Sequence, residues 1–384
     1  MDSAPLVYLV AGEPSGDLLA SRLMQALREK LPSVQFAGVG GETMTALGLQ
    51  SVFNIADISV MGIMELLPRL RTIFKRLAQT EADIIQKQPQ VLVTVDSWGF
   101  VQQLLQRLQK KGVQIPKVHY VAPQVWAWKK GRAKTTARLV DHLMTLLPME
   151  PPYFEKHGLA CTFVGHPVIE NTAELLHDDT AFRARYGISP ESLLLTVLPG
   201  SRHSEVSRLI PVFQKTLKQL QPHFPKLHLL IPSVVAMVPE VEKAFVRFPI
   251  PHSIITGQYE RYAAFQSSCF ALAASGTVSL ELTACGTPHL IAYSFNPITN
   301  KMVKYVAGTR YANLVNILAD EEIIPEFVLE RCRASLIAPK ALALMQDAES
   351  RKAQLHAAQQ QLLKLRPEGI LPSQKAAEVV IGKL

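Results

Sequence analysis

Two loops in the sequence combine residue types that could bind a phosphorylated ligand and a hydroxyl-rich ligand. One of them reads LLLTVLPGSRHSEV over residues 193–206, an apolar strand pattern that breaks at Pro199-Gly200 before a helix. The start of a helix offers unpaired N–H groups and partial positive charge, which suit phosphate. Arg202 adds a cation at the same place. We therefore expect Gly200, Ser201 and Arg202 to contact a phosphate group.

The other loop has the same outline but the opposite charge. It reads LVYLVAGEPSGD over residues 6–17, again an apolar strand pattern, a glycine-containing loop and a helix start. Carboxylates there would repel phosphate, so we expect a neutral, hydroxyl-rich ligand in contact with Glu13, Ser15 and Asp17. A phosphate site on one loop and a hydroxyl site on the other are typical of sugar transfer.

Asp96 ends the apolar run VLVTV and precedes Ser97-Trp98-Gly99. In open parallel sheets, ligands bind at the carboxyl ends of the strands. A carboxylate placed there, with its basicity adjusted by burial and by the neighbouring tryptophan, could take a proton from a hydroxyl group. The competing interpretation is an N-cap for the helix expected over residues 100–109.

A second small-residue turn, Ser275-Gly276-Thr277, follows the apolar run 270–274 and opens a helix that carries Glu281. Small residues allow a diphosphate to approach the helix start, and Glu281 could accept hydrogen bonds from a ribose. There is no Asp-x-Asp sequence of the kind that holds a divalent metal on a sugar nucleotide. We therefore expect no metal and no cofactor, and a leaving diphosphate stabilised by Arg202 and helix termini.

Residues 61–77, MGIMELLPRLRTIFKRL, form an amphipathic helical pattern with two competing interpretations. Its apolar stripe consists of Ile63, Leu66, Leu67, Leu70, Ile73, Phe74 and Leu77, extended by Met61, Met64 and Pro68. Its basic flanks are Arg69, Arg71, Lys75 and Arg76. An ordinary core-facing helix has such a stripe. Basic flanks are also what a helix needs to lie in an anionic membrane surface and accept acyl chains.

The segment HYVAPQVWAW (119–128) leads into five basic residues within 129–138 and no acidic one. Between residues 60 and 140 there are 14 Lys and Arg against 4 Asp and Glu, although the whole chain has a net charge of only +8. Nucleic acid or an anionic membrane could each explain this concentration. No RNA-binding signature accompanies it, so we expect no nucleic-acid partner. His142 and His166 are interpreted as structural.

The elements that must position these residues alternate between short apolar runs and helical patterns. The expected strands are residues 6–11, 34–39, 91–95, 118–121, 142–146, 161–164, 193–198, 227–231, 253–256, 270–274 and 289–292. This alternation predicts an α/β protein with parallel sheets built from βαβ units. We expect two Rossmann-like domains facing a cleft, an acceptor and membrane-facing domain over 1–166 and a donor domain over 167–338. The hinge is expected near residues 165–167, and helices over 339–384 should pack back on the core.

Composition supports a two-domain protein without a membrane span. The chain has 384 residues, enough for two domains that each form a core. Its hydrophobic fraction of 48% is high, but the longest uncharged stretches are broken by Ser, Gly, Asn and Pro. No basic segment follows Met1, which predicts no secretory signal. Four separated cysteines without a CxxC sequence predict a reduced, cytosolic setting and no zinc site.

Taken together, these segments resemble lipid-A-disaccharide synthase, a family of bacterial glycosyltransferases with the GT-B fold. The matching stretches are AGEPSGD (11–17), VMGIMELL (60–67), HYVAPQVWAW (119–128), FVGHP (163–167), LPGSR (198–202), SGTVSLE (275–281) and NLVNILA (313–319). One departure concerns the segment after Asp96, where Trp98-Gly99 replaces the Pro-Asp often found in the family. The expected base is retained, but a role for a second carboxylate there is lost.

The resemblance implies transfer of 2,3-diacylglucosamine from its UDP derivative to 2,3-diacylglucosamine 1-phosphate, giving a β-1,6-linked disaccharide phosphate and UDP. It assigns the base to Asp96, the diphosphate to Arg202 and the Ser275–Thr277 turn, the ribose to Glu281, and part of the nucleotide pocket to Asn316. It also implies a cytoplasmic protein held peripherally at the inner face of the inner membrane, and it leaves a homodimer open. The alternatives are a UDP-sugar epimerase or hydrolase of the same fold, and a non-catalytic protein that binds the membrane surface.

Overall fold

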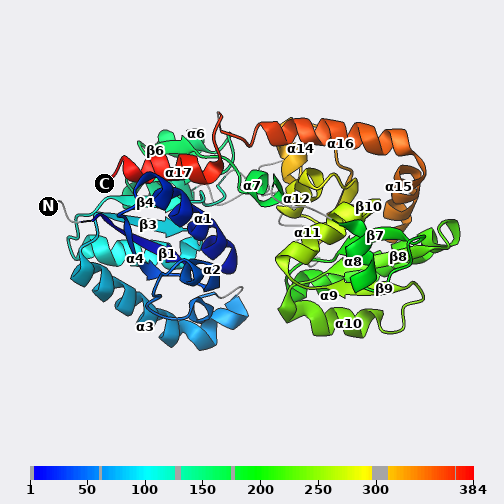
Figure 1. Ribbon diagram of the computed structural model, residues 1–384, viewed down its shortest axis with the longest axis horizontal. Coiled ribbons are helices and arrows are strands. Elements are labelled where there is room, and N and C mark those ends of the chain that lie inside the picture. The colour runs from blue at the N-terminus through cyan, green and yellow to red at the C-terminus, as the bar shows by residue number, and fades with distance from the viewer. Residues whose placement is uncertain (1–3, 60–62, 126–130, 174–177, 296–309, 368) are drawn as a thin grey trace. The chain divides into compact units, whose positions relative to one another are not determined.

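The computed structural model describes residues 4–59, 63–125, 131–173, 178–295, 310–367 and 369–384 (Figure 1). The chain divides into two compact units. The first contains residues 1–167 and 365–384, and the second contains residues 168–364.

The first unit is a parallel sheet covered on both faces by helices. Its strands are β1 (Leu6–Ala11), β2 (Gln35–Val39), β3 (Val91–Val95), β4 (Lys117–Tyr120), β5 (His142–Thr145) and β6 (Ala160–Phe163). Its helices are α1 (Pro14–Lys30), α2 (Glu42–Ala46), α3 (Ile63–Lys87), α4 (Trp98–Lys110), α5 (Gly131–Leu139), α6 (Pro151–Glu155) and α17 (Pro372–Ile381).

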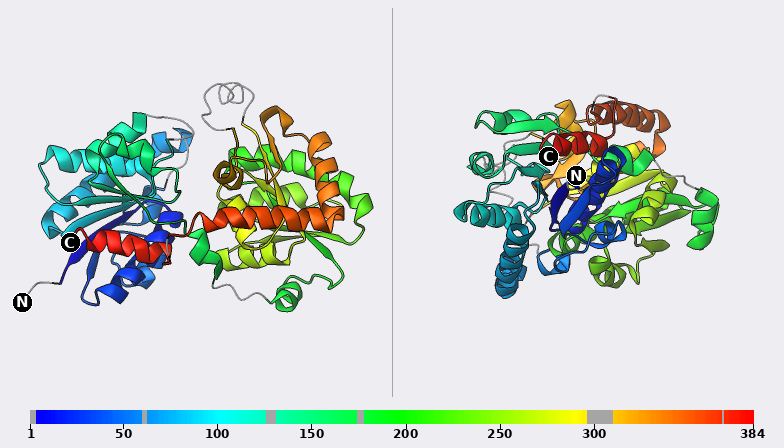
Figure 2. Two further views of the ribbon diagram at one scale, coloured as in Figure 1. Left: turned by 90° about the horizontal axis from the view of Figure 1, so that it is seen from above. Right: turned by 60° about the vertical axis from the view of Figure 1, so that its left-hand side comes forward.

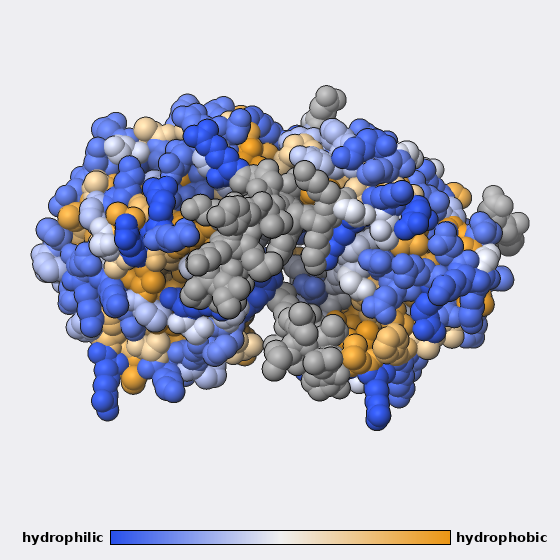
Figure 3. Space-filling model, turned by 180° about the vertical axis from the view of Figure 1, so that it is seen from behind, coloured by the Kyte–Doolittle hydropathy of each residue, from blue (hydrophilic) through white to orange (hydrophobic). Residues whose placement is uncertain are grey.

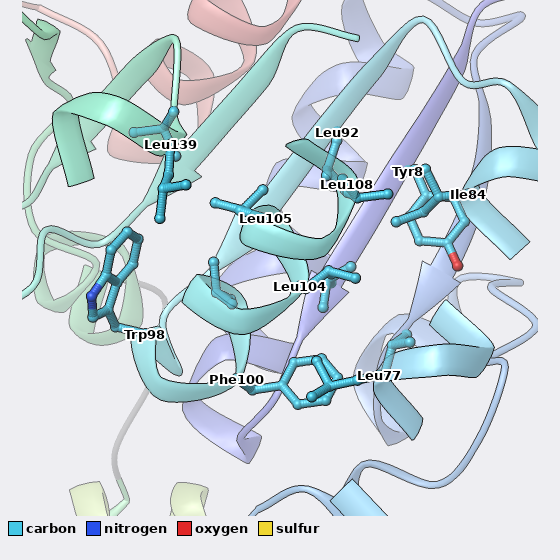
Figure 4. Close-up of a cluster of buried hydrophobic side chains, with 14 of the residues drawn as sticks. Tyr8, Leu77, Ile84, Leu92, Trp98, Phe100, Leu104, Leu105, Leu108 and Leu139 are labelled. Carbon is cyan, nitrogen blue, oxygen red and sulfur yellow. The ribbon is translucent and has the colours of Figure 1, made fainter. Parts of the chain in front are cut away.

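The apolar strands are continuous because both faces of this sheet are buried. In β1, Tyr8 and Val10 enter one core with residues of α3, α4 and α5, as Figure 4 shows for Tyr8. Val7 and Leu9 enter a second core with residues of α1, α2 and α17. Successive side chains of one strand therefore stabilise two separate helix layers.

The second unit repeats this architecture. Its strands are β7 (Leu193–Leu198), β8 (Leu227–Pro232), β9 (His252–Ile255), β10 (Phe270–Ala274), β11 (His289–Tyr293) and β12 (Glu326–Val328). Its helices are α7 (Val168–Ala173), α8 (Asp179–Arg185), α9 (His203–Leu220), α10 (Val238–Phe245), α11 (Gln258–Ser267), α12 (Val278–Ala284), α14 (Leu314–Ala319), α15 (Ala334–Gln346) and α16 (Ala348–Leu363). Figure 2 shows this sheet and its helices from two further directions.

Strand order gives each sheet one switch point. The first sheet has the order β2-β1-β3-β4-β5-β6 and the second β12-β11-β10-β7-β8-β9, with all strands parallel. The connections therefore leave β1 and β3 in opposite directions, and likewise β7 and β10. Ligands of doubly wound sheets bind at such switch points, outside the carboxyl ends of the strands.

The region expected as 339–384 is shared between the units. Helices α15 and α16 belong to the second unit, whereas α17 packs against α1 of the first, where Lys30 and Glu378 form an ion pair of 3.2 Å. Helices α15 and α16 are separated at Asp347. The carboxylate of Asp347 accepts the N–H of Ser350 and thereby starts α16 as a new helix.

The expected strands lie within one residue of the observed ends, and β12 is the strand that the sequence did not predict. It has only three residues and no apolar run, because Glu326 is its first residue. Within the described residues, no helix is long and apolar enough to cross a membrane.

Candidate active site

Asp96 lies directly after β3, at the switch point of the first sheet. Its φ is +53° and that of Ser97 is +46°, so two consecutive residues with side chains adopt the left-handed conformation. Such backbone costs energy and persists where the surroundings over-determine it, often at active sites. The N–H of Asp96 donates to the carbonyl of Tyr120 at 2.9 Å, which anchors the turn to β4.

The N-cap interpretation of Asp96 does not describe this geometry. Helix α4 begins at Trp98, and its N-cap is Ser97, which makes no side-chain capping bond. Asp96 Oδ1 instead accepts the N–H of the adjacent Ser97 at 2.8 Å. Burial raises the pKa of Asp96 above its ordinary value, and the Ser97 N–H opposes that shift. Asp96 is therefore a stronger base than an exposed aspartate.

Glu13 lies beside this turn. It belongs to the loop after β1, and β1 is the neighbour of β3 in the sheet. Ser97 Oγ donates to Glu13 Oε1 at 3.4 Å. A Cβ at Gly12 would lie 2.6 Å from Ser97 Oγ, so glycine is what allows the loops after β1 and β3 to meet. Ser15 is exposed in the first turn of α1.

Asp17 has a structural role that corrects its assignment as a sugar contact. Its side chain is 3% exposed, and its two oxygens accept the N–H groups of Gly41, Thr43 and Met44 and the hydroxyl of Thr43. These bonds hold the first turn of α2. A motif in sequence shows the carboxylate, but not that these distant donors already occupy it.

Glu205 organises the loop after β7, and the sequence did not identify it. Its Oε2 accepts the N–H of Ser201 at 3.1 Å, and its Oε1 lies 3.3 Å from Arg202 Nη1. Tyr293 donates to the same Oε1 at 3.0 Å. Gly200 has φ +115°, and a Cβ there would lie 2.6 Å from Glu205. The Ser201 N–H expected for phosphate is thus given to Glu205, whereas the Arg202 side chain is 54% exposed beside it.

The Ser275–Thr277 turn follows β10, the neighbour of β7, so both expected phosphate loops lie at one switch point. Ser275 Oγ donates to the carbonyl of Ala312 at 2.8 Å. Gly276 and Thr277 are exposed, and Thr277 is the N-cap of α12 without a side-chain capping bond. The turn therefore presents small residues at the sheet edge.

Glu281 lies one turn into α12 and pairs with Arg261, a residue that sequence reasoning did not single out. The ion pair measures 3.2 Å. Burial raises the pKa of Glu281, and the charge of Arg261 acts in the opposite direction. A contact of this carboxylate with a ribose must therefore coexist with the Arg261 pair.

Asn316 is fully buried, and its amide is committed within the protein. Its Nδ2 donates to the carbonyl of Ile324 and to Glu326, and its Oδ1 accepts the N–H of Ile324. These bonds correct its assignment as a direct nucleotide contact. Any effect of Asn316 on a ligand must act through the residues that it holds.

Helix α3 has features of both interpretations, the core-facing helix and the membrane-surface helix. Ile73 and Leu77 are buried in the core of the first unit, and Figure 4 shows Leu77 beside Phe100. Phe74 is 52% exposed, with Arg71 and Lys75 exposed near it. Met61 lies outside the described residues, and the structure describes only the backbone of 63–68, which includes Ile63, Met64, Leu66 and Leu67.

Two of the basic flanks are used within the first unit. Arg76 pairs with Asp57 at 2.6 Å, and Arg69 donates to the carbonyl of Ala56 at 3.0 Å. On the face of the molecule in Figure 3, hydrophobic residues occur mostly in small groups among hydrophilic ones.

Trp98, the departure from the family pattern, is a core residue 7% exposed. Its ring centroid lies 5.0 Å from that of His119, and burial lowers the pKa of His119 to about 3, so a neutral imidazole packs behind the turn. Trp126, Trp128, Lys129 and Lys130 lie outside the described residues. In α5, Lys134 and Arg138 are exposed. No group of three His, Cys, Asp or Glu suited to a metal occurs in the described part of the chain.

Solved structures share the fold at low sequence identity. The S. aureus MnaA-UDP co-structure has a TM-score of 0.69 and 12% identity, covering 98% of this chain and 95% of that one. UDP-GlcNAc 2-epimerase from Neisseria meningitidis has a TM-score of 0.67 at 10% identity, covering 99% and 98%. A glycosyltransferase from Rickettsia africae has a TM-score of 0.59 at 11% identity, covering 100% and 98%. These likenesses establish the two-domain GT-B fold, which epimerases and transferases share.

Sequence comparison distinguishes between the epimerases and the glycosyltransferases that share this fold. The family model described as lipid-A-disaccharide synthetase matches residues 7–380. Lipid-A-disaccharide synthase of Paramagnetospirillum magneticum is 46% identical over 379 residues, covering 98% of this chain and 97% of the relative. That of Rhodospirillum centenum is 44% identical over 378 residues, covering 98% and 94%. The chain therefore belongs to the lipid-A-disaccharide synthase family of glycosyltransferases.

Proposed function

We propose that this enzyme transfers 2,3-diacylglucosamine from UDP to the sugar hydroxyl of 2,3-diacylglucosamine 1-phosphate. The products are the β-1,6-linked disaccharide 1-phosphate, a precursor of lipid A, and UDP. The observation that carries the proposal is the position of a carboxylate and an arginine at the two switch points, Asp96 after β3 and Arg202 after β7.

In this reaction Asp96 accepts the proton of the attacking acceptor hydroxyl. The oxygen forms a bond to the anomeric carbon of the donor as the bond from that carbon to the diphosphate breaks. Attack from the side opposite the leaving group inverts the configuration. Burial of Asp96 favours this role, because a raised pKa increases its affinity for the proton. Glu13, joined to the turn through Ser97, and Ser15 are proposed to contact the acceptor sugar.

On the donor side, Arg202 is proposed to neutralise the charge that develops on the leaving diphosphate. The Ser275–Thr277 turn gives the diphosphate close access to the same edge of the sheet, and Glu281 is proposed to accept from the ribose. Glu205 holds Arg202 and the Ser201 N–H in this loop. Its carboxylate restrains the loop while adding a negative charge that Arg202 must offset.

We further propose that the enzyme works at the inner face of the inner membrane, where it binds the anionic surface peripherally. Acylated substrates partition into bilayers, and Phe74 with Arg71 and Lys75 provides an apolar and cationic patch on α3. Residues 61–67, which include Met61, Ile63, Met64, Leu66 and Leu67, are proposed to bind the membrane together with these side chains.

Mass spectrometry of the products tests the function. The purified protein is incubated with UDP-2,3-diacylglucosamine, with and without the acceptor. Transfer predicts a disaccharide phosphate and stoichiometric UDP only when the acceptor is present. A hydrolase would release UDP and free sugar without the acceptor, and an epimerase would give an isomer of the donor with unchanged mass. Either result would contradict the proposal.

A further inference from the structure

The carboxylate of Glu326 lies at the centre of a buried polar cluster in the second unit. It accepts the backbone N–H groups of Ala312 at 2.8 Å and Asn313 at 2.9 Å. It also accepts the side-chain amides of Asn313 at 2.5 Å and Asn316 at 3.0 Å. Glu326 is only 5% exposed. A single side chain thus fixes the backbone at residues 312–313 and the start of α14.

This cluster extends to the turn at the end of β10. Ala312 is held by Glu326 through its N–H and by Ser275 through its carbonyl, which accepts the Ser275 hydroxyl at 2.8 Å. Ala312 therefore links Glu326 to Ser275 through two direct hydrogen bonds. Ser275 opens the turn that is proposed to receive the diphosphate.

Burying the carboxylate of Glu326 to hold a loop costs free energy. The four donors described above are neutral amides, and burial raises the pKa of Glu326. The four donors satisfy both carboxylate oxygens of Glu326. Replacing either oxygen by a group that cannot accept a hydrogen bond would leave a buried N–H group without this partner. This geometry resists any shift of residues 312–313 relative to β12.

We propose that Glu326 is a positioning residue of the donor site, which acts through Ala312 to set the Ser275–Thr277 turn for the diphosphate. This role rests on the proposed donor site in the second unit. It also gives a reason for the buried amide of Asn316, which holds Glu326 instead of the nucleotide.

The test is UDP binding by the full-length Glu326→Gln variant, measured by calorimetry well below its unfolding temperature. Glutamine places an NH2 group against at least one of the four donors, so we expect the affinity for UDP to fall by about tenfold or more. The matched control is Gln354→Met, which removes two buried hydrogen bonds to the backbone of His289 at the first residue of β11. This control should lose stability but keep native UDP affinity.

A double-mutant cycle with Ser275→Ala tests the connecting contact. If Glu326 acts through Ser275, the two substitutions together should weaken UDP binding less than the product of their separate effects. Independent, multiplicative effects would overturn the proposal, as would native UDP affinity in Glu326→Gln.

If the Glu326→Gln variant does not fold, hydrogen exchange in the native protein provides a second test. UDP should slow hydrogen exchange of the Ala312 and Asn313 amides, because an ordered turn restrains the cluster. Unchanged exchange at saturating UDP would overturn the positioning role. Absence of UDP binding by the native protein would instead contradict the donor site itself, so the two failures are distinguishable.

Discussion

Asp96, the proposed base, illustrates at the residue scale how a functional group can oppose stability. Because burial raises its pKa, the ionised carboxylate is less favourable in the folded state than in the unfolded chain. This penalty is fully present above the raised folded-state pKa and disappears as the pH falls toward the ordinary value of an aspartate. We predict that Asp96→Asn is more thermostable than the native protein at pH 7, and that the gain shrinks at pH 4.

Thermal unfolding of both proteins at the two pH values measures this difference. Asparagine and aspartate both tolerate a positive φ, so the substitution should leave the backbone strain of the turn little changed. A gain that is equal at both pH values would therefore show that the Asp96 carboxylate is not destabilised by burial.

Arg202 and Glu281 give the corresponding prediction for the donor. Arg202→Ala should weaken binding of both UDP and pyrophosphate, because a charge-assisted contact to the diphosphate is lost. Glu281→Ala should weaken UDP through the ribose but leave pyrophosphate competition unchanged. Calorimetry with the two ligands makes the comparison, and native UDP affinity in both variants would mean that the donor site has been misplaced.

Other residues mark the limit of sequence reasoning about the site. The position of Asp96 could be predicted, since a carboxylate that follows an apolar strand lies at the carboxyl end of a parallel sheet. Asp17 was assigned to a sugar from the charge of its loop, and Asn316 to the nucleotide pocket from the family resemblance. Neither argument shows the partners that occupy these side chains in the fold. Arg261 and Glu326 were missed because only the fold brings their partners Glu281 and Ala312 close. Glu205 contacts Ser201 and Arg202 of its own loop, but in the sequence it is an ordinary acidic residue in the first turn of a helix.

At the scale of elements, α3 carries the prediction about the membrane. Replacing Ile63, Leu66 and Leu67 with Ser should release the protein from anionic vesicles and lower activity on acylated substrates, without changing UDP binding. High salt should weaken native binding only in part, because the apolar contribution is not screened. Leu77→Ser is the contrasting variant. Leu77 is fully buried in the core, so its replacement should destabilise the fold.

Co-sedimentation with vesicles decides between the two interpretations of this helix. A triple variant that sediments like the native protein would show that residues 63–67 do not bind the membrane.

Most elements could be predicted because buried parallel strands are short, continuous apolar runs. The sequence could not show β12, whose three residues begin with Glu326, since its pairing depends on β11. Nor could it show the break between α15 and α16, because one Asp in a helical pattern is an ordinary surface residue until its carboxylate caps a helix.

For the whole molecule, the repeated architecture explains how the two halves of the reaction are separated. Each unit has its own core and its own switch point, with the proposed base in one and the proposed phosphate loops in the other. The sequence predicted both sheets, but it did not predict that α17 completes the first unit. Ala376, Ala377 and Val380 would fit any apolar surface, and only the contact with α1 specifies which one.

This separation makes one measurement the most direct test of the account. Asp96→Asn is assayed for disaccharide phosphate with saturating donor and acceptor, and its affinity for UDP is measured in parallel. Loss of general base catalysis should lower turnover by about 10²–10⁴-fold. UDP affinity should stay native, because Asp96 belongs to the first unit and the donor loops to the second. Turnover near the native rate in the folded variant would contradict the assignment of Asp96 as the base.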